Sequence, residues 1–367
     1  MTLLIITHHR LISQWSGAIS RIRRLAQELA AQGAQVTVLA FVSPKLKPLL
    51  PLELGNNCDY YEFSNWLQWG DGLMNRFGFP AYSFTSHLNQ FLPLPLALRK
   101  TYDVVISESP FLWKIARRFP CRLKVLSSHN HELTYHNHFP KPFLLPIKWL
   151  EKKALQEADV VVTVSKTDQN IFRKMIPQKA ITVIENGFDR HSGNSPAALS
   201  PFFSDLTKRT ALFLASQSNH NLKALEALVL IFSASSVSKK WRLWVVGNIK
   251  PQFNLPTNIF MCGPQKELLP FFQNAEIALN PMVSGSGSNL KLIESLGNGC
   301  PVLTTPLGAR GFPPGLMGLH IESLQNFQER LLSSRSWQKP DQLELVPFQW
   351  QELGLKYYRY LDSCLKS

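Results

Sequence analysis

Short apolar runs alternate with helical patterns along almost the whole sequence, and this alternation restricts the fold more than any other feature. The runs are rich in Val, Ile and Leu and do not alternate apolar with polar residues, which is typical of strands buried on both faces. In the first half they lie at 3–6, 36–41, 103–107, 123–128, 160–165 and 181–186. In the second half they lie at 211–215, 241–247, 258–263, 276–280, 301–305 and 319–321.

The segment between the first two runs predicts a helix from about residue 18 to 31. Ile22, Leu25 and Leu29 recur there at helical spacing, and Gly33 follows as a stop signal. A strand, a helix and a second strand in this order favour a parallel sheet, so we expect an α/β fold. Further helical patterns lie at 221–233, 265–274, 289–298 and 350–365.

The stretch SGNSPAALSPFFS at 192–204 has no charge and two prolines, and it predicts a linker. We therefore expect a Rossmann-like domain over 1–190, a second one over 205–348 and a C-terminal helix over 349–367. Two such domains in tandem would face each other across a cleft. Ligands of parallel α/β sheets bind at the carboxyl ends of the strands, so the sites are expected there.

Composition excludes several classes of protein. Five cysteines without a CxxC pair argue against a zinc ribbon or a disulfide scaffold and favour a reducing, cytoplasmic compartment. No basic stretch precedes the first apolar run, so we expect no signal peptide. The longest uncharged stretch, 77–98, contains three prolines and several polar residues and does not predict a membrane span.

The net charge of +14 lies mostly in the first half, where residues 1–188 carry 22 Lys and Arg against 13 Asp and Glu. Such a field favours anionic partners, although it is also compatible with a generic solubilising charge. Nucleic acid is not favoured as a partner, because no aromatic RNA-binding motif is present.

The most informative segment is NPMVSGSGSNLKLIESLGNGCPVLTTPLGARGF, residues 280–312. A strand ends in Asn280-Pro281, a loop of glycine and serine follows over 284–288, and a helix then begins near Asn289. A helix start offers unpaired N–H groups to a phosphate, and Glu294, one turn deeper, suits the two hydroxyls of a ribose. The segment therefore predicts a nucleoside diphosphate site; an ordinary strand–loop–helix turn is the alternative. It matches neither the dinucleotide fingerprint nor the P-loop.

This segment resembles the donor-binding segment of the family-four retaining glycosyltransferases, which have the GT-B fold. The resemblance extends over nearly the whole chain. Further similar segments are Ser16-Gly17 with Arg21, SSHNHELTY (127–135), ADVVVTVSKTD (158–168), IENGFD (184–189) and ASQSNHNLKALEAL (215–228).

The resemblance implies an enzyme that transfers a sugar from a nucleotide-sugar to a glycan or lipid-linked acceptor. The second domain would bind the donor, the first would bind the acceptor, and the C-terminal helix would cross back to the first. The anomeric configuration would be retained by front-face transfer, with no metal and no cofactor. Two alternatives stay open on the same scaffold, namely an epimerase-type enzyme and a non-catalytic nucleotide-sugar-binding protein.

The resemblance also assigns roles to individual residues. Glu294 would hold the ribose, while Gly17 and the backbone N–H groups of Gly287, Ser288 and Asn289 would meet the diphosphate. His129 would contact the transferred sugar or polarise the reacting oxygens, and a purely structural role is its alternative. Two donor positions depart from the family pattern. Ser286 stands where many relatives have a glutamate, and Lys291 or Lys223 would replace a missing Gly-Arg and Lys pair.

Three further residues are candidate acceptor contacts. His8 and His9 follow the first strand, and Arg21 lies in the first helix; solvent-exposed positions are the alternative for all three. The histidine-rich stretch 129–138 does not match a zinc protease, because His131 and His136 are five residues apart rather than four.

The segments 84–100 and 139–153 mix aromatic and apolar residues with lysine and arginine. They would either lie in a membrane interface or pack against the first domain. The first possibility adds an anionic membrane surface as a partner, with the protein on the cytoplasmic face. The sugar, the base, the acceptor and the oligomeric state have no signature in the sequence.

Overall fold

The computed structural model describes residues 1–11, 17–42, 54–64, 98–190 and 208–367, together with positions 70, 73, 88, 91, 93 and 94. The expected linker at 192–204 lies outside the described residues, as does most of the segment 84–100. The described chain divides into two compact units. Unit 1 comprises residues 1–185 and 350–367, and unit 2 comprises residues 186–349.

Unit 1 contains a seven-stranded sheet in the order β3-β2-β1-β4-β5-β6-β7, and all its strand pairs are parallel. The strands are β1 (Thr2–Thr7), β2 (Gln35–Val42), β3 (Cys58–Ser64), β4 (Tyr102–Ser107), β5 (Cys121–Ser128), β6 (Val160–Thr163) and β7 (Ala180–Val183). The helices are α1 (Gly17–Ala31), α4 (Trp113–Ala116), α5 (Glu132–Tyr135), α6 (Lys141–Glu157), α7 (Lys166–Met175) and α14 (Trp350–Lys366), with a 3₁₀ turn at Pro110–Leu112.

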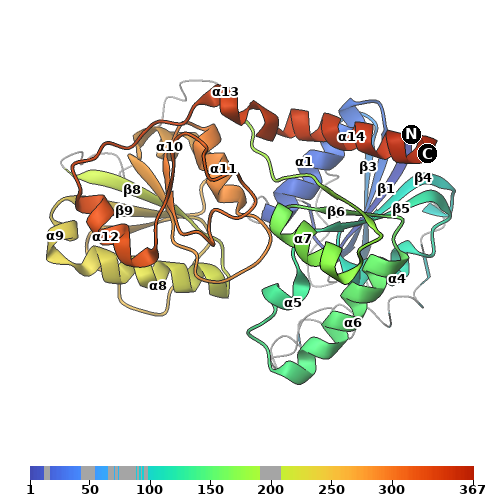
Figure 1. Cartoon of the computed structure of the whole chain (residues 1–367), viewed down its shortest axis with the longest axis horizontal. Helices are drawn as coiled ribbons and strands as arrows, with labels where there is room; N and C mark the ends of the chain where they lie inside the picture. The colour runs from blue at the N-terminus through green and yellow to red at the C-terminus, as the bar shows by residue number, and fades with distance from the viewer. Residues whose placement is uncertain are drawn as a thin grey trace. The chain divides into compact units, whose positions relative to one another are not determined.

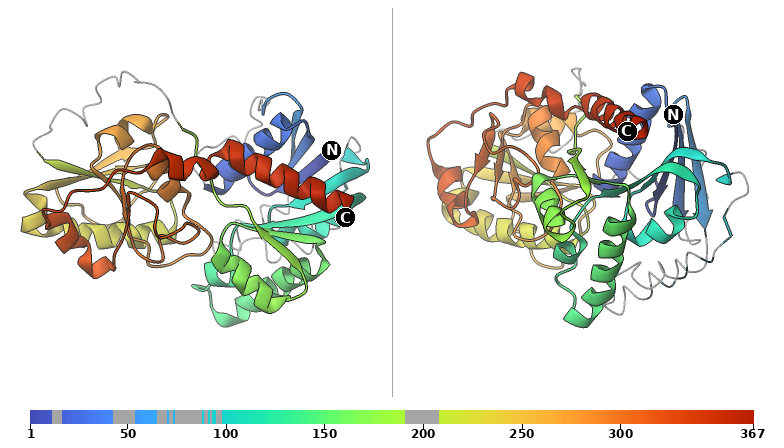
Figure 2. Two further views of the ribbon diagram at one scale, coloured as in Figure 1. Left: turned by 45° about the horizontal axis from the view of Figure 1, so that its top comes forward. Right: turned by 45° about the vertical axis from the view of Figure 1, so that its right-hand side comes forward.

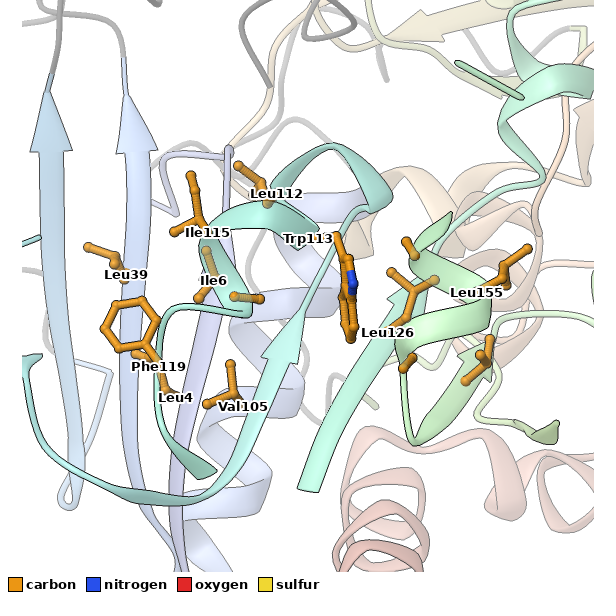
Figure 3. Close-up of a cluster of buried hydrophobic side chains, with 14 of the residues drawn as sticks. Leu4, Ile6, Leu39, Val105, Leu112, Trp113, Ile115, Phe119, Leu126 and Leu155 are labelled. Carbon is orange, nitrogen blue, oxygen red and sulfur yellow. The ribbon is translucent and has the colours of Figure 1, made fainter. Parts of the chain in front are cut away.

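Hydrophobic side chains lie on both faces of the unit 1 sheet. Successive side chains of a strand point to opposite faces, and in these strands both sets are apolar. Leu4 and Ile6 of β1 pack on one side with Trp113 and Phe119, as Figure 3 shows. The same cluster includes Leu155 of α6 and Phe172 of α7. Leu3 and Ile5 point to the opposite side and are equally buried. Both faces are therefore covered, which explains the continuous apolar runs in the sequence.

The C-terminal helix α14 is part of unit 1, where it packs against α1 (Figures 1 and 2). Gly354 permits this packing, because a Cβ atom at this position would lie 2.2 Å from the Cβ of Glu28. Leu353, Tyr357 and Leu361 form the buried stripe of α14 at helical spacing. The two ends of the described chain thus contribute to one domain.

Unit 2 repeats the architecture with a six-stranded sheet in the order β10-β9-β8-β11-β12-β13. Its strands are β8 (Arg209–Leu214), β9 (Trp241–Val246), β10 (Ile259–Gly263), β11 (Ile277–Asn280), β12 (Val302–Thr304) and β13 (Leu319–Ile321). Its helices are α8 (Asn219–Ser233), α9 (Ser235–Ser238), α10 (Leu269–Asn274), α11 (Leu290–Gly297), α12 (Phe327–Leu332) and α13 (Gln342–Leu345), with 3₁₀ turns at Leu324–Asn326 and Val346–Phe348.

Helices α8, α9 and α12 cover one face of this sheet, and α10 and α11 lie on the other (Figures 1 and 2). Phe232, Trp241 and Phe327 lie in the buried cluster on the first face. The predicted α/β class with two Rossmann-like parallel-sheet domains is confirmed. In both sheets the strand order reverses at one point, between β1 and β4 and between β8 and β11, where such sheets bind their ligands.

Strand β3 and helix α6 were not among the elements predicted from the sequence. CDYYEFS carries two acidic residues and forms an edge strand, which among the described strands pairs with β2 alone, so its sequence lacks the apolar run of a central strand. Segment 139–153 belongs largely to helix α6, which is packed against unit 1 through Ile147, Leu150 and Leu155. None of the helices within the described ranges is both long enough and apolar enough to cross a bilayer.

Candidate functional site

The loop between β11 and α11 lies at the carboxyl edge of the unit 2 sheet, beside the point where the strand order reverses. Asn280, the last residue of β11, fixes its start. The Nδ2 atom of Asn280 donates to Thr304 Oγ1 and to the Gly308 carbonyl, each at 3.1 Å. These hydrogen bonds join the end of β11 to the end of β12 and the segment that follows it.

Glycine is required in this loop by its backbone conformation. Gly285 has φ +119° and Gly287 has φ +73°, both in the region that favours glycine. The residues between and after them, Ser286 and Ser288, are half-buried. The two glycines of the Ser-Gly repeat are thus explained by the tight turn that leads the chain into α11.

Three side chains that the sequence analysis did not assign hold the loop in place. His220 Nδ1 lies 2.8 Å from Ser284 Oγ, and Asn186 Nδ2 donates to Ser288 Oγ at 2.7 Å. Arg310 donates to the carbonyl of Gly285. Arg310 lies in the stretch GARG at 308–311 of the same informative segment, but only the fold brings its guanidinium to the loop.

The amino end of α11 has no side-chain cap. Asn289 is its N-cap residue, yet its side chain donates to the Gly308 carbonyl at 2.9 Å and makes no capping hydrogen bond. The first N–H groups of the eight-residue helix therefore donate no hydrogen bond to the N-cap side chain. Together with the helix dipole, they can bind an anion.

Glu294 lies one turn inside α11 and is half-buried. Burial, with a smaller contribution from Asp189, raises its pKa to about 7. Across the described parts of the chain, no group donates a hydrogen bond to its carboxylate. A carboxylate in this condition can accept hydrogen bonds from two vicinal hydroxyls, and such donors would lower its pKa.

Lys291 is the second ionisable group of α11 with an altered pKa. Its Nζ donates to Asn221 Oδ1 at 2.9 Å and to the Leu214 carbonyl at 3.3 Å, and it lies 4.8 Å from the centre of the Phe213 ring. Burial lowers the pKa of Lys291 to about 7. Lys291 therefore links α11 to the end of β8 and the start of α8, whereas Lys223 is exposed on α8.

A second group of polar residues lies at the carboxyl ends of β1, β4 and β5 in unit 1. His129 follows β5, and its Nε2 lies 2.6 Å from Oε2 of Glu108, which follows β4. Ser127 donates to the same carboxylate oxygen at 2.9 Å. Glu108 is buried, and its own N–H donates to the Ile6 carbonyl at 3.0 Å.

His8 and His9 follow β1 and join this group. Their ring centroids are 4.2 Å apart, and the N–H of His9 donates to Thr7 Oγ1 at 3.0 Å. Burial, aided by repulsion from the neighbouring histidines, lowers the pKa of His8 well below its usual value. Burial and His129 lower the pKa of His9 to about 4. Both rings are half-buried and neutral near pH 7, and their contact with an acceptor stays a prediction.

Arg21 is buried in α1 rather than solvated. Its guanidinium donates to the carbonyls of Glu185 at 2.7 Å and Ile184 at 2.8 Å, just after β7. The exposed-face alternative for Arg21 is wrong, because its side chain is almost fully buried and α14 packs against α1. Gly17 is the exposed first residue of α1. Its role and the acceptor role of Arg21 stay predictions.

No cluster of three or more His, Cys, Asp or Glu side chains suited to a metal ion occurs among the described residues. Glu108 is the functional candidate that the sequence analysis missed in unit 1. Its only signal in the sequence is an acidic residue directly after a buried strand, and the pairing of Ser107 with Leu126 then brings it beside His129.

Two family models match the chain, one in each unit. The model of Glycosyltransferase Family 4 matches residues 15–192, and that of Glycosyl transferases group 1 matches residues 208–333. A search of curated proteins finds no match.

Many solved structures share the fold over the whole chain. Sucrose-phosphate synthase from Thermosynechococcus elongatus has a TM-score of 0.71 and 15% identity, with 99% of each chain covered. The Anabaena protein Alr3699/HepE, solved with UDP and glucose, has a TM-score of 0.66 and 13% identity, with 98% of this chain and 99% of that chain covered. WaaG, a glycosyltransferase involved in lipopolysaccharide biosynthesis, has a TM-score of 0.60 and 14% identity, with 100% and 99% covered.

Proposed function

The chain belongs to the family-4-like glycosyltransferases with the GT-B fold, and we propose that it transfers a sugar, with retention, from a nucleoside diphosphate donor to a glycan or lipid-linked acceptor. Unit 2 would bind the donor and unit 1 the acceptor. The observation that carries this proposal is the arrangement of α11, whose uncapped amino end precedes a half-buried carboxylate, Glu294, by one turn.

The donor fits this arrangement group by group. The diphosphate would lie against the N–H groups of Gly287, Ser288 and Asn289, and the ribose hydroxyls would donate to Glu294. Lys291 would add positive charge, because a nearby phosphate favours its protonated form. Proteins of this fold that bind such ligands are known: the Anabaena protein was solved with UDP and glucose.

Transfer by the front-face route needs few protein acids or bases. The acceptor oxygen bonds to the anomeric carbon on the face from which the diphosphate departs. The bond between that carbon and the diphosphate oxygen breaks, and the departing oxygen takes the acceptor's proton. We propose that His129, held by Glu108, contacts the transferred sugar or its reacting oxygens, while His8 and His9 are neutral contacts for the acceptor.

We propose that the reaction needs no metal. The reason is that the helix start offers partial positive charge to the leaving diphosphate, and Lys291 would add a full charge once a phosphate beside it favours its protonated form. Activity should be unchanged by EDTA. Loss of activity with EDTA and recovery with Mg²⁺ would contradict the proposal that no metal is needed. It would not contradict the proposed donor site.

A glycan or lipid-linked acceptor is supported by the basic first half of the chain and by the fold shared with WaaG, which acts in lipopolysaccharide biosynthesis. Sucrose-phosphate synthase shares the same fold, so a small sugar acceptor belongs in the test. A panel of lipid-linked, oligosaccharide and sugar-phosphate acceptors separates these classes.

The central experiment measures donor binding and turnover. Nucleoside diphosphates and nucleotide-sugars are screened by thermal shift, and release of the nucleoside diphosphate is followed with each acceptor. Glu294→Ala should weaken binding of the preferred nucleotide about tenfold or more, because it removes a charged hydrogen-bond acceptor. The matched control is Glu226→Ala on the exposed face of α8, which should leave binding unchanged. Unchanged affinity in Glu294→Ala would contradict the site assignment.

One observation favours a second candidate, a non-catalytic nucleotide-sugar-binding protein. Ser286 stands in the loop where many family members have a glutamate, and a hydroxyl replaces a carboxylate there. The two candidates differ in one measurement. Donor binding without any release of nucleoside diphosphate, across the acceptor panel, would favour the second.

A further inference from the structure

Helix α6 of unit 1 presents an exposed face on which basic and apolar side chains alternate. Lys141, Leu145, Lys148, Trp149 and Lys152 recur at intervals of three and four residues, so they share one side of the helix. We call these five residues the α6 face. The opposite side packs into unit 1 through Ile147, Leu150, Glu151, Ala154 and Leu155.

The apolar members of the α6 face are unusually open to solvent. Leu145 is 67% exposed and Trp149 is 47% exposed. The Nζ atoms of Lys153 and Lys114 lie 4.9 Å and 5.5 Å from the centre of the Trp149 ring, which places further positive charge beside it. In Figures 1 and 2 the amino end of α6 projects beyond the strands of unit 1.

The acidic residues of α6 do not oppose this charge. Glu151 is fully buried, and Glu157 accepts a hydrogen bond from Trp113 Nε1 at 2.8 Å and pairs with Arg117 at 3.2 Å. The α6 face therefore carries three lysines and no acid. An anionic surface is complementary to it.

We propose that the α6 face docks unit 1 on an anionic lipid bilayer. Three lysines at one face would contact the headgroups, and Leu145 and Trp149 would enter the interface between headgroups and acyl chains. A soluble polyanion would use the lysines but would leave the apolar side chains in water, so the alternation favours lipid. The inference is independent of the donor chemistry proposed for unit 2.

The test is cosedimentation with phosphatidylcholine vesicles that contain phosphatidylglycerol. The unaltered protein should bind at low salt, bind pure phosphatidylcholine vesicles far less, and lose about tenfold in affinity when salt is raised to about 0.5 M. No binding at low salt, or equal binding to neutral vesicles, would overturn the proposal.

Two pairs of substitutions distinguish the two contributions. Lys148→Glu with Lys152→Glu should weaken binding about tenfold or more. Leu145→Ser with Trp149→Ser should also weaken vesicle binding and leave heparin binding unchanged. The matched control, Lys239→Glu with Lys240→Glu, makes the same charge change at exposed positions of unit 2 and should change binding less than about threefold.

Two further measurements accompany the vesicle assay. Each variant is melted to confirm folding and titrated with a nucleoside diphosphate, which should bind as to the unaltered protein if the donor site is intact. Equal losses in the α6 pair and the control pair would overturn the proposal, because binding would then follow net charge. Unchanged vesicle binding in the serine pair, together with tight heparin binding, would indicate a polyanion as the partner instead.

Discussion

The Nε2 atom of His129 lies 2.6 Å from the Oε2 atom of Glu108, and the two residues follow neighbouring parallel strands. Ser127 donates to the same oxygen, so the carboxylate is fixed from two directions. A carboxylate in this position orients the imidazole ring and selects which of its nitrogens carries the proton. Glu108 is thus a positioning residue for the proposed role of His129.

Glu108→Gln should therefore lower kcat about 10- to 100-fold and leave donor affinity unchanged. The amide keeps the shape of the side chain but removes the negative charge that orients the ring. Transfer assays and donor titrations measure the two effects, and Glu108→Asp should restore part of the rate. Nitrogen NMR shifts of His129 report the change of tautomer. An unaltered kcat would show that the pair is only structural.

Arg21→Met should destabilise unit 1 by about 2–4 kcal/mol, because two buried carbonyls lose their charged donor. Denaturant melts measure this, and Arg23→Met, on the same helix but less buried, should cost far less. If Arg21 contacts the acceptor instead, stability would hold and the acceptor KM would rise.

Arg21 illustrates a kind of contact that sequence patterns do not predict. The helical pattern placed Arg21 in the first helix, but α14, which packs against that helix, comes from the far end of the chain. Local periodicity contains no information on such a contact. The same limit applies to Glu108, whose partner His129 depends on the pairing of β4 with β5.

The strands and the loop between β11 and α11 could be predicted, because burial and backbone conformation are reflected in their local sequence. Runs such as 36–41 and 160–165 are apolar because both faces of each sheet are covered, so burial is visible in the local sequence. The glycines at 285 and 287 were visible because their backbone conformations exclude most other residues. Strand β3 escaped prediction because it is a half-polar edge strand.

Glu294→Gln should stabilise the ligand-free protein in a pH-dependent way. The folded pKa of Glu294 is about 7 against an ordinary value of 4.5, so the wild-type carboxyl supports folding below pH 4.5. That support is lost as pH rises from 4.5 to 7, because the unfolded chain releases its proton first. The variant should thus match wild type near pH 4 and exceed it by up to about 3 kcal/mol at pH 8.

Urea unfolding at several pH values measures this difference, with Glu226→Gln on the exposed face of α8 as the control. A difference in stability that is constant from pH 4 to pH 8 would show that folding does not raise the pKa of the Glu294 carboxyl. Donor binding to the same variant is measured separately, because the lost hydrogen-bond acceptor should weaken it.

Lys291 should take up a proton when a nucleoside diphosphate binds at pH 8. Its pKa of about 7 leaves most of the free protein uncharged there, and a phosphate beside it favours the charged form. Glu294 is already largely ionised at this pH and has little to release. Calorimetric titration in buffers of different ionisation enthalpy counts the protons.

Two controls accompany the proton count. The corresponding nucleoside lacks the diphosphate and should bind without uptake, and Lys291→Met should abolish uptake and weaken the diphosphate more than the nucleoside. Uptake that persists in Lys291→Met would assign the proton to another group. The absence of proton uptake in the unaltered protein would show that the phosphate does not lie beside Lys291.

Gly287→Ala should destabilise the loop and weaken donor binding together. A φ of +73° costs a residue with a Cβ atom about 1–2 kcal/mol, and relief of that strain would move the N–H groups that precede α11. Gly315→Ala is the control, because a Cβ there meets nothing within 4 Å and its backbone is not left-handed. Melting and nucleotide titration of both variants should separate them. Equal behaviour of the two would mean that the backbone of this loop neither stores strain nor contacts the donor.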